Sequence, residues 1–110
     1  MKCQPFLSLI LPIFNEESRL QNGLEKISKY LYSRSLSYEI IIVNDGSSDQ
    51  SIKIMRDFQK NNQGITLVSY KKNEGKGYAV RRGVAKARGQ WILFCDIDLS
   101  VDINHYDKFA

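Results

Sequence analysis

The sequence has few residues that build covalent or metal frameworks. Its 110 residues include two cysteines, Cys3 and Cys95, and one histidine, His105. The cysteines lie far apart and lack the spacing of metal-ligand pairs, which argues against a disulfide-rich scaffold and a zinc site. We therefore expect an intracellular chain with reduced thiols, and we expect His105 to be a surface residue of a final helix.

Long hydrophobic runs are also missing. No apolar segment approaches the roughly 20 residues that a membrane-spanning helix needs, and the N-terminus lacks a signal-peptide pattern. We expect a cytoplasmic protein that does not cross a membrane by itself, located at the cytoplasmic membrane surface in a full-length form. Apolar residues make up 43% and charged residues 25% of the chain, as is usual for one soluble globular domain.

Acidic residues are scarce in one segment. The net charge is +4, but residues 71–88 contain seven basic side chains and one acid, Glu74. This segment suits an anionic partner such as a diphosphate, a nucleic-acid backbone or an acidic membrane surface, and a solvated helix face is the alternative. Because no aromatic residues are interleaved with these charges in a recognisable nucleic-acid motif, we expect no nucleic-acid partner.

Hydrophobic periodicity alternates regularly between strand and helix. Short, nearly continuous apolar runs predict buried strands over residues 6–13, 38–43, 65–70 and 91–95. Helical spacing predicts helices over residues 16–32, 48–61 and 76–88. We expect Asn15 to cap the first helix, Ser47 or Ser48 to cap the second with Asp49 near its start, and Gly89 to close the third.

This alternation predicts an α/β fold, a doubly wound parallel sheet with helices on both faces. Ligands of such sheets bind beyond the carboxyl ends of the strands, where the strand order reverses. With the order 3-2-1-4, the first and fourth strands are neighbours and their ends form one crevice. Three polar clusters follow strand ends: PIFNEE, NDGSSD and DIDLS.

Asp96 and Asp98 are the most suggestive pair. Residues two apart in an extended segment point to the same side, so both carboxylates can address one site. Such oxygen ligands suit Mg²⁺ or Mn²⁺, with diphosphate oxygens completing the shell. The structural alternative is that one aspartate caps a helix while the other is solvated.

Two further clusters have weaker signals. Asp45 follows the second strand in a turn-forming sequence, at the crevice mouth, where it can accept hydrogen bonds from a base or a ribose. Gly75 and Gly77 flank Lys76 before a helix, which allows close backbone approach and offers charge to a phosphate. The spacing matches neither a Walker A motif nor the dinucleotide fingerprint.

Taken jointly, PIFNE, NDGS, NEGKG and DIDLS resemble the nucleotide-sugar-binding half of GT-A-type glycosyltransferases of family two. The stretch NEGKGYAVRRGVAKARGQWILFCDIDLS is most similar to dolichyl- and polyprenyl-phosphate glycosyltransferases. The resemblance runs from Leu7 to about Val101. It implies that residues 1–110 form a single domain, the truncated N-terminal part of a GT-A domain.

The resemblance also implies roles for individual residues. The implied nucleotide-sugar-binding residues are Pro12, Phe14, Glu16, Asp45, Gly75, Lys76, Gly77 and Asp96. Asp98 would be the main protein ligand of a Mg²⁺ or Mn²⁺ ion, and Asp96 and Asp98 would be the catalytic pair. The chain departs from the family pattern at Phe14, often a tyrosine, at Asn44, often an aspartate, and at Ser100, where some relatives carry a metal-holding glutamine.

The implied reaction is inverting transfer of a hexose from a nucleoside diphosphate sugar, of the UDP-glucose or GDP-mannose type, to a polyprenyl or dolichyl phosphate. A lipid phosphate is already anionic and needs no strong general base, while the metal neutralises the leaving group. We expect nucleotide binding without robust turnover by these residues alone. The open edge of the fourth strand invites pairing, so a dimer is also expected.

Other classes remain open on the residues alone. A non-catalytic α/β nucleotide- or Mg-binding module of the response-regulator kind needs an aspartate at the end of the third strand, where this chain has SYKKN. A nucleotidyltransferase would carry a glycine-rich loop after the first strand, and PIFNEES contains no glycine. Nucleic-acid binding has only the basic segment in its favour.

Overall fold

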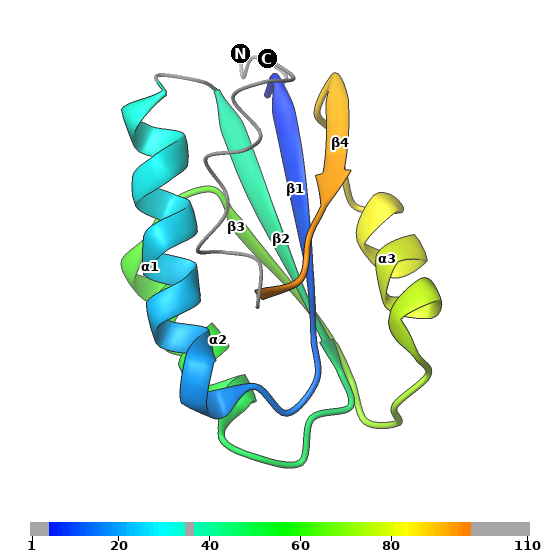
Figure 1. Ribbon diagram of the computed structural model, residues 1–110. Coiled ribbons are helices and arrows are strands. Elements are labelled where there is room, and N and C mark those ends of the chain that lie inside the picture. Colours follow the sequence, from blue (N-terminus) through cyan, green and yellow to red (C-terminus); the bar gives the residue numbers. More distant parts are fainter. Residues whose placement is uncertain (1–4, 35–36, 98–110) are drawn as a thin grey trace.

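The computed structural model describes residues 5–34 and 37–97, in which strands and helices alternate strictly (Figure 1). The strands are β1 (Leu7–Ile13), β2 (Tyr38–Asp45), β3 (Ile65–Tyr70) and β4 (Trp91–Phe94). The helices are α1 (Glu17–Ser33), α2 (Ser51–Asn61) and α3 (Lys76–Val84). All strand pairs are parallel, in the order β3-β2-β1-β4. The predicted fold class and strand order are confirmed.

The sheet is covered on both faces, with α1 and α2 on one side and α3 on the other (Figure 1). Along β1 and β2 alternate side chains enter different cores, because successive residues of a strand point to opposite faces. Leu9 and Ile40 pack with the helices α1 and α2, whereas Ile10 and Ile41 pack with Ala79 of α3. This two-sided burial explains why both strands are continuous apolar runs.

The third helix is shorter than expected: it ends at Val84, four residues before the predicted end. After it, Lys86 N donates to Gly83 O and Ala87 N donates to Val84 O, which continues the chain in tighter turns. The prediction that Gly89 caps the helix was wrong. Gly89 lies against β1, and a Cβ atom there would stand 2.6 Å from the backbone nitrogen of Ser8. Close approach of two backbones therefore explains this glycine.

The predicted caps of the first two helices were also wrong. Asn15 has a φ of 50° and precedes Glu16, the actual N-cap of α1, and Gln50 is the N-cap of α2. The Asn15 side chain accepts a hydrogen bond from Ser48 N at 2.8 Å, and its backbone nitrogen donates to Ser47 Oγ at 3.0 Å. The loops after β1 and β2 are neighbours, so Asn15 pairs with Ser47 and Ser48 of the other loop instead of capping its own helix.

Asp49 lies just before α2, near the helix start as predicted. Its carboxylate accepts hydrogen bonds from Ser51 N at 2.9 Å and from Glu17 N at 3.2 Å. Burial raises the pKa of Asp49, but the hydrogen bonds from Ser51 and Glu17 favour the charged form and leave the pKa below its usual value. Asp49 thus joins the starts of α1 and α2.

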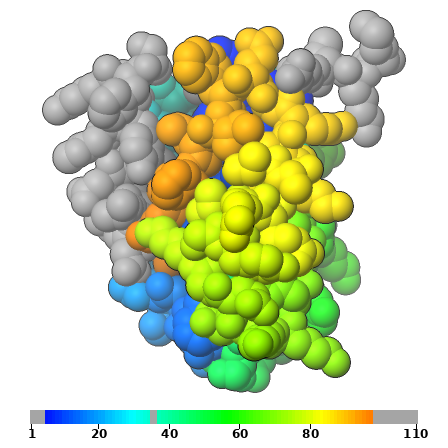
Figure 2. Space-filling view, turned by 90° about the vertical axis from the view of Figure 1, so that its right-hand side faces the viewer, coloured from blue at the N-terminus to red at the C-terminus, as the bar shows by residue number. Residues whose placement is uncertain are grey.

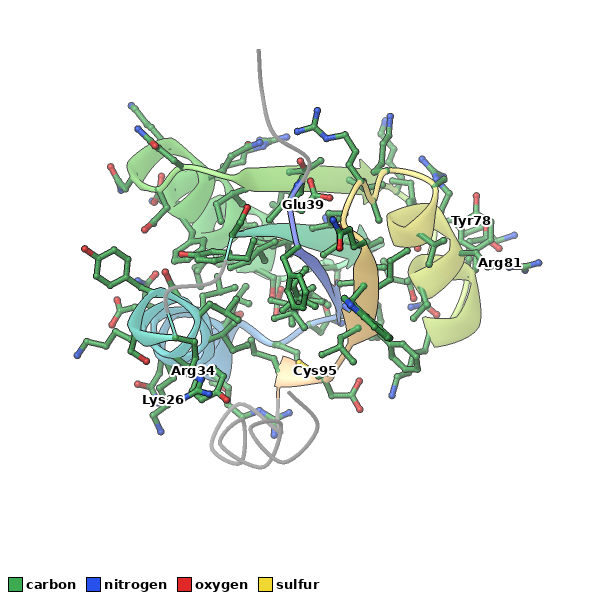
Figure 3. The ribbon with its side chains drawn as sticks, turned by 90° about the horizontal axis from the view of Figure 1, so that it is seen from above. Lys26, Arg34, Glu39, Tyr78, Arg81 and Cys95 are labelled. Atoms are coloured by element: carbon green, nitrogen blue, oxygen red, sulfur yellow. The ribbon has the colours of Figure 1, made fainter. Side chains whose placement is uncertain are left out.

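A buried polar cluster ties together the opposite end of the sheet, which Figure 3 views from above with Glu39 labelled. Ser8 of β1 donates to Glu39 Oε2 of β2 at 2.6 Å, and Arg88 N donates to the same oxygen at 2.6 Å. Gly89 N donates to Ser8 Oγ at 2.7 Å. Because each polar group has a partner, Ser8 and Glu39 can be buried without an unsatisfied donor or acceptor.

The fourth strand is more exposed than predicted. Its four residues, Trp91, Ile92, Leu93 and Phe94, are between 39% and 63% exposed. In the described part of the chain β4 has one neighbouring strand, β1, and α3 packs on β1 and β2. Figure 2 shows β4 at the surface beside α3. Directly after it, the Cys95 side chain is buried.

Candidate functional site

The polar clusters that follow the strands meet at the carboxyl end of the sheet, around a hollow of about 260 Å³. We name this hollow the strand-end crevice. It is lined by Pro12, Ile13, Phe14, Glu16, Asp45, Asn73, Gly75, Lys76 and Asp96. A crevice where β1 separates β2 from β4 is the position at which open parallel sheets bind ligands.

Most of the predicted site residues are therefore neighbours in space. Pro12, Phe14 and Glu16 come from the end of β1, and Asp45 ends β2. Gly75, Lys76 and Asp96 complete the predicted members of the lining. Gly77 lies in the first turn of α3, exposed and outside the lining. Asp98, together with Ser100 and His105, falls outside the described residues.

Asp45 is almost completely buried and holds the loop between β3 and α3. Its carboxylate accepts hydrogen bonds from Glu74 N at 2.9 Å, from Gly75 N at 3.0 Å and from Asn73 Nδ2 at 2.8 Å. Hydrogen bonds to an ionised acceptor are about twice as strong as neutral ones. Asp45 therefore fixes the loop that forms one wall of the crevice.

Gly46 makes this loop contact sterically possible. Its φ is 73°, and a Cβ atom would lie 2.4 Å from Asn73 N. A substitution would therefore meet both an unfavourable backbone conformation and a backbone atom that cannot rotate away. The glycine of NDGS is required because the β3–α3 loop lies directly against it.

Asn73 and Ile13 are lining residues that the sequence reasoning did not identify. Asn73 Nδ2 donates to the backbone oxygen of Asp45 at 3.0 Å as well as to its carboxylate. The partners are 28 residues apart, and the one local signal of Asn73 is its turn preference. Ile13 belongs to an apolar run, which indicated a core position.

An aromatic cluster joins the end of β3 to α3. The rings of Tyr70 and Tyr78 meet edge to face with centroids 5.3 Å apart, and the Arg82 guanidinium lies 5.1 Å from the Tyr70 ring. Arg82 also donates to the Tyr78 hydroxyl at 3.0 Å. Among the described residues the buried Tyr70 hydroxyl has no hydrogen-bond partner. Burial, followed by the nearby Asp45 carboxylate, raises the pKa of Tyr70.

Lys76 and Asp96 form an ion pair across the crevice. Lys76 Nζ lies 2.7 Å from Asp96 Oδ2, and the two side chains are 54% and 41% exposed. A solvent-exposed pair of this kind contributes only about 0.2–1 kcal/mol, because water screens the attraction and both side chains lose freedom. The pair joins the first residue of α3 to the segment after β4 without fixing either side chain strongly.

The carboxylates of the crevice are chemically suited to a divalent cation, although they differ in the partners that already occupy their oxygen atoms. Asp45 is held by the loop, and Glu16 is paired with Arg19. Asp96 has Lys76 as its partner. Within the described residues no three acidic, histidine or cysteine side chains are grouped closely enough to hold a metal. Among the crevice carboxylates, Glu16 and Asp96 each have one cationic partner, whereas Asp45 accepts three hydrogen bonds from the loop.

None of the described helices is both long and apolar enough to cross a membrane. Six of the seven basic residues between 71 and 88 are exposed: Lys71, Lys72, Lys76, Arg81, Lys86 and Arg88. Arg81 points away from the body of the molecule in Figure 3. The positive charge of this segment is therefore presented outward on α3 and its flanking turns.

Comparison with known proteins identifies relatives of the whole described region. Residues 8–110 match the family described as glycosyl transferase family 2. The dolichyl-phosphate beta-glucosyltransferase of Dictyostelium discoideum is 36% identical over 110 residues, covering 94% of this chain and 34% of the relative. The enzyme of the same name from Drosophila melanogaster is 36% identical over 109 residues, covering 93% of this chain and 33% of the relative. The chain spans about a third of the length of these curated relatives.

Solved structures share the fold. The mannosyltransferase PcManGT from Pyrobaculum calidifontis, in complex with GDP-Man and Mn²⁺, has a TM-score of 0.77 at 24% identity, covering 87% of this chain and 28% of that one. TarS residues 1–349 from S. aureus, in complex with UDP-GlcNAc, has a TM-score of 0.74 at 23% identity, with 94% and 31% covered. Both alignments support the Rossmann-like arrangement expected from the sequence.

Proposed function

The chain belongs to glycosyl transferase family 2, and on this premise we propose that it forms the donor-binding part of an inverting hexosyltransferase. The donor is a nucleoside diphosphate sugar of the UDP-glucose or GDP-mannose type, and the acceptor is a polyprenyl or dolichyl phosphate. The observation that carries the proposal is the strand-end crevice, in which one apolar wall, three carboxylates and one lysine converge.

The lining residues divide naturally between the parts of such a donor. Pro12, Ile13 and the half-exposed ring of Phe14 offer an apolar wall for the base. Asp45 would accept a hydrogen bond from the base or the ribose. Near Lys76, the backbone at Gly75 and Gly77 allows close approach of the diphosphate.

Asp96 and Asp98 would hold a Mg²⁺ or Mn²⁺ ion, since hard oxygen ligands suit both cations. When bound, the ion supplies neutralisation of the charge that develops on the leaving diphosphate. Asp96 contacts the ribose and sugar side of the donor in this arrangement. The relative PcManGT was solved with GDP-Man and Mn²⁺, which supports a divalent cation here.

The acceptor oxygen attacks the anomeric carbon from the face opposite the leaving group, so the configuration inverts. A phosphate acceptor is ionised at neutral pH, and the chain needs to position it rather than deprotonate it. The exposed basic residues around α3 favour an anionic acceptor surface at the cytoplasmic face of a membrane. The names of the Dictyostelium and Drosophila relatives support dolichyl phosphate as the acceptor.

A dimer through β4 is part of the same proposal. The strand has an open edge in the described part of the chain and four exposed apolar side chains, which favour pairing with another chain. Sedimentation velocity should show a dimer, and Trp91→Lys should convert this dimer to a monomer. The control Tyr32→Lys changes an exposed residue of α1 and should leave the dimer intact. A monomeric parent chain would contradict this part of the proposal.

Calorimetric titration tests the donor site. UDP, GDP and dTDP are each titrated with Mn²⁺ and again with EDTA, on the parent chain, on Asp98→Asn and on the control Asp57→Asn, which changes an exposed residue of α2. We expect one nucleotide to bind, with binding lost in EDTA and in Asp98→Asn but kept in the control. Failure of every nucleotide to bind a folded chain would contradict the proposal, and metal binding alone would favour a simple Mg-binding module.

A further inference from the structure

Lys76 is the one cationic side chain among the residues that line the strand-end crevice. Three carboxylates share this lining: Glu16, Asp45 and Asp96. A diphosphate that enters the crevice meets this negative charge, which repels it. The position of the single lysine therefore decides how favourable the crevice is for an anion.

The two ends of Lys76 differ in how firmly they are held. Its backbone begins α3 directly after Gly75, whose nitrogen donates to the buried Asp45. Its ammonium group, at the end of an exposed side chain, lies 2.7 Å from Asp96 Oδ2. Among the described residues, no other side chain pairs with Lys76 Nζ or with the Asp96 carboxylate. A fixed base with a loosely held tip allows the ammonium group to change partner while the helix stays in place.

We propose that Lys76 is an exchangeable counter-ion of the donor site. It pairs with Asp96 in the donor-free protein and transfers to the diphosphate when the donor binds, which frees Asp96 for the donor and its cation. The proposal rests on the proposed function, because it needs a diphosphate ligand. It adds that Lys76 opposes binding of a metal ion alone and favours binding of the diphosphate.

The proposal therefore predicts that a change at Lys76 shifts the affinities for Mn²⁺ and for pyrophosphate in opposite directions. A lysine that only contacts phosphate would change the pyrophosphate affinity alone. In Lys76→Met, Asp96 has no counter-ion, so Mn²⁺ alone should bind about 2- to 5-fold more tightly, the factor that corresponds to an exposed ion pair. Inorganic pyrophosphate should bind about 10-fold or more weakly, because a charge-assisted contact is lost. Uridine and guanosine, which lack phosphate, should bind the variant and the parent equally.

The control variant is Lys72→Met, which removes the same charge from an exposed position outside the crevice lining. If net charge alone matters, both variants should shift Mn²⁺ and pyrophosphate binding equally. Circular dichroism confirms that each variant is folded. Mn²⁺ binding is measured by electron paramagnetic resonance of the free ion, and pyrophosphate and nucleoside binding by calorimetry.

A double-mutant cycle makes the test specific to the pair. In an Asp96→Asn background the lysine has no carboxylate to neutralise, so Lys76→Met should leave Mn²⁺ affinity unchanged. The exchange is refuted if Lys76→Met weakens both Mn²⁺ and pyrophosphate, if it matches Lys72→Met, or if its effect on Mn²⁺ persists in the Asp96→Asn background. Failure of the parent chain to bind any nucleotide would instead refute the proposed function, and the Mn²⁺ comparison would still test the Lys76–Asp96 pair.

Discussion

Two glycines of α3 should respond in opposite directions to the same substitution. Gly83 packs against β1, where a Cβ atom would lie 2.5 Å from Ile10 Cγ2 and 3.3 Å from Ile10 Cδ1. Gly77 is exposed, and a Cβ atom there would have no neighbour within 4 Å. Both residues are in α3, so comparing the two alanine substitutions separates the cost of packing from the gain in helix propensity.

The magnitudes follow from these contacts. Carbon atoms pack best at about 3.5–4.0 Å, so Gly83→Ala forces α3 and Ile10 apart by roughly 1 Å. Ile10 is completely buried and stiff at its branched Cβ, which makes relief by rotation costly. Overpacking costs about 1–3 kcal/mol, against a propensity gain of about 1 kcal/mol at most. Gly77→Ala has the gain alone, about 0.4–1 kcal/mol.

Urea unfolding followed by far-ultraviolet circular dichroism measures both variants. We expect Gly83→Ala to lower the unfolding midpoint and Gly77→Ala to raise it, with unchanged slopes. Ile10→Leu removes Cγ2, so the double variant Gly83→Ala with Ile10→Leu should recover stability relative to the sum of the single changes. Equal stabilisation by the two alanine substitutions, or additivity in the double variant, would refute the packing argument.

Three further perturbations test other contacts. Tyr70→Phe should leave the free energy of unfolding unchanged or raise it by about 1 kcal/mol, because it removes a buried hydroxyl without a described partner. A clear loss of stability in thermal unfolding would show that the hydroxyl has a hydrogen-bond partner. Asp49 has a pKa below its usual 3.8, so it stabilises the fold above about pH 4 and loses this effect as the pH falls through the folded pKa. Asp49→Asn should therefore lose less stability than the parent between about pH 5 and pH 2. Parallel curves of unfolding free energy against pH for the two proteins would contradict this direction. Gly89→Ala should cost about 2 kcal/mol or more, because its Cβ atom would stand 2.6 Å from Ser8 Oγ and from its backbone nitrogen; a thermal midpoint within about 2 °C of the parent would rule out the close approach.

The sequence predicted the layers of the fold better than the ends of its helices. Buried strands and amphipathic helices leave strong periodic signals, and these produced the correct order of elements along the chain and the correct fold class. Helix ends depend on competition between local caps and distant partners. Asn15 was a reasonable cap by type, but the loop after β2 lies close enough to take its hydrogen bonds. Gly89 resembled a helix terminator, although its real constraint is Ser8, 81 residues earlier.

Much of the site could be predicted because its residues follow strand ends, and parallel strands bring their carboxyl ends to one edge. What could not be predicted is how each side chain divides its contacts. Asp45 was expected to face the ligand, and the structure adds three loop donors from a segment 28 to 30 residues later. The exposure of β4 also escaped prediction, since an apolar run does not reveal how many of its faces find a partner.

The position of β1 between β2 and β4 affects how the protein folds during synthesis. Among the described strands the ribosome produces β1 before the others, and β2 can pair with it early. The other edge of β1 stays open until β4 has been translated, the last of the described strands. Pairings this distant in sequence form slowly, because a long loop must close before any contact rewards it. A nascent chain stalled before Trp91 would therefore expose its most apolar strand, and chaperones that recognise such edges should bind it there.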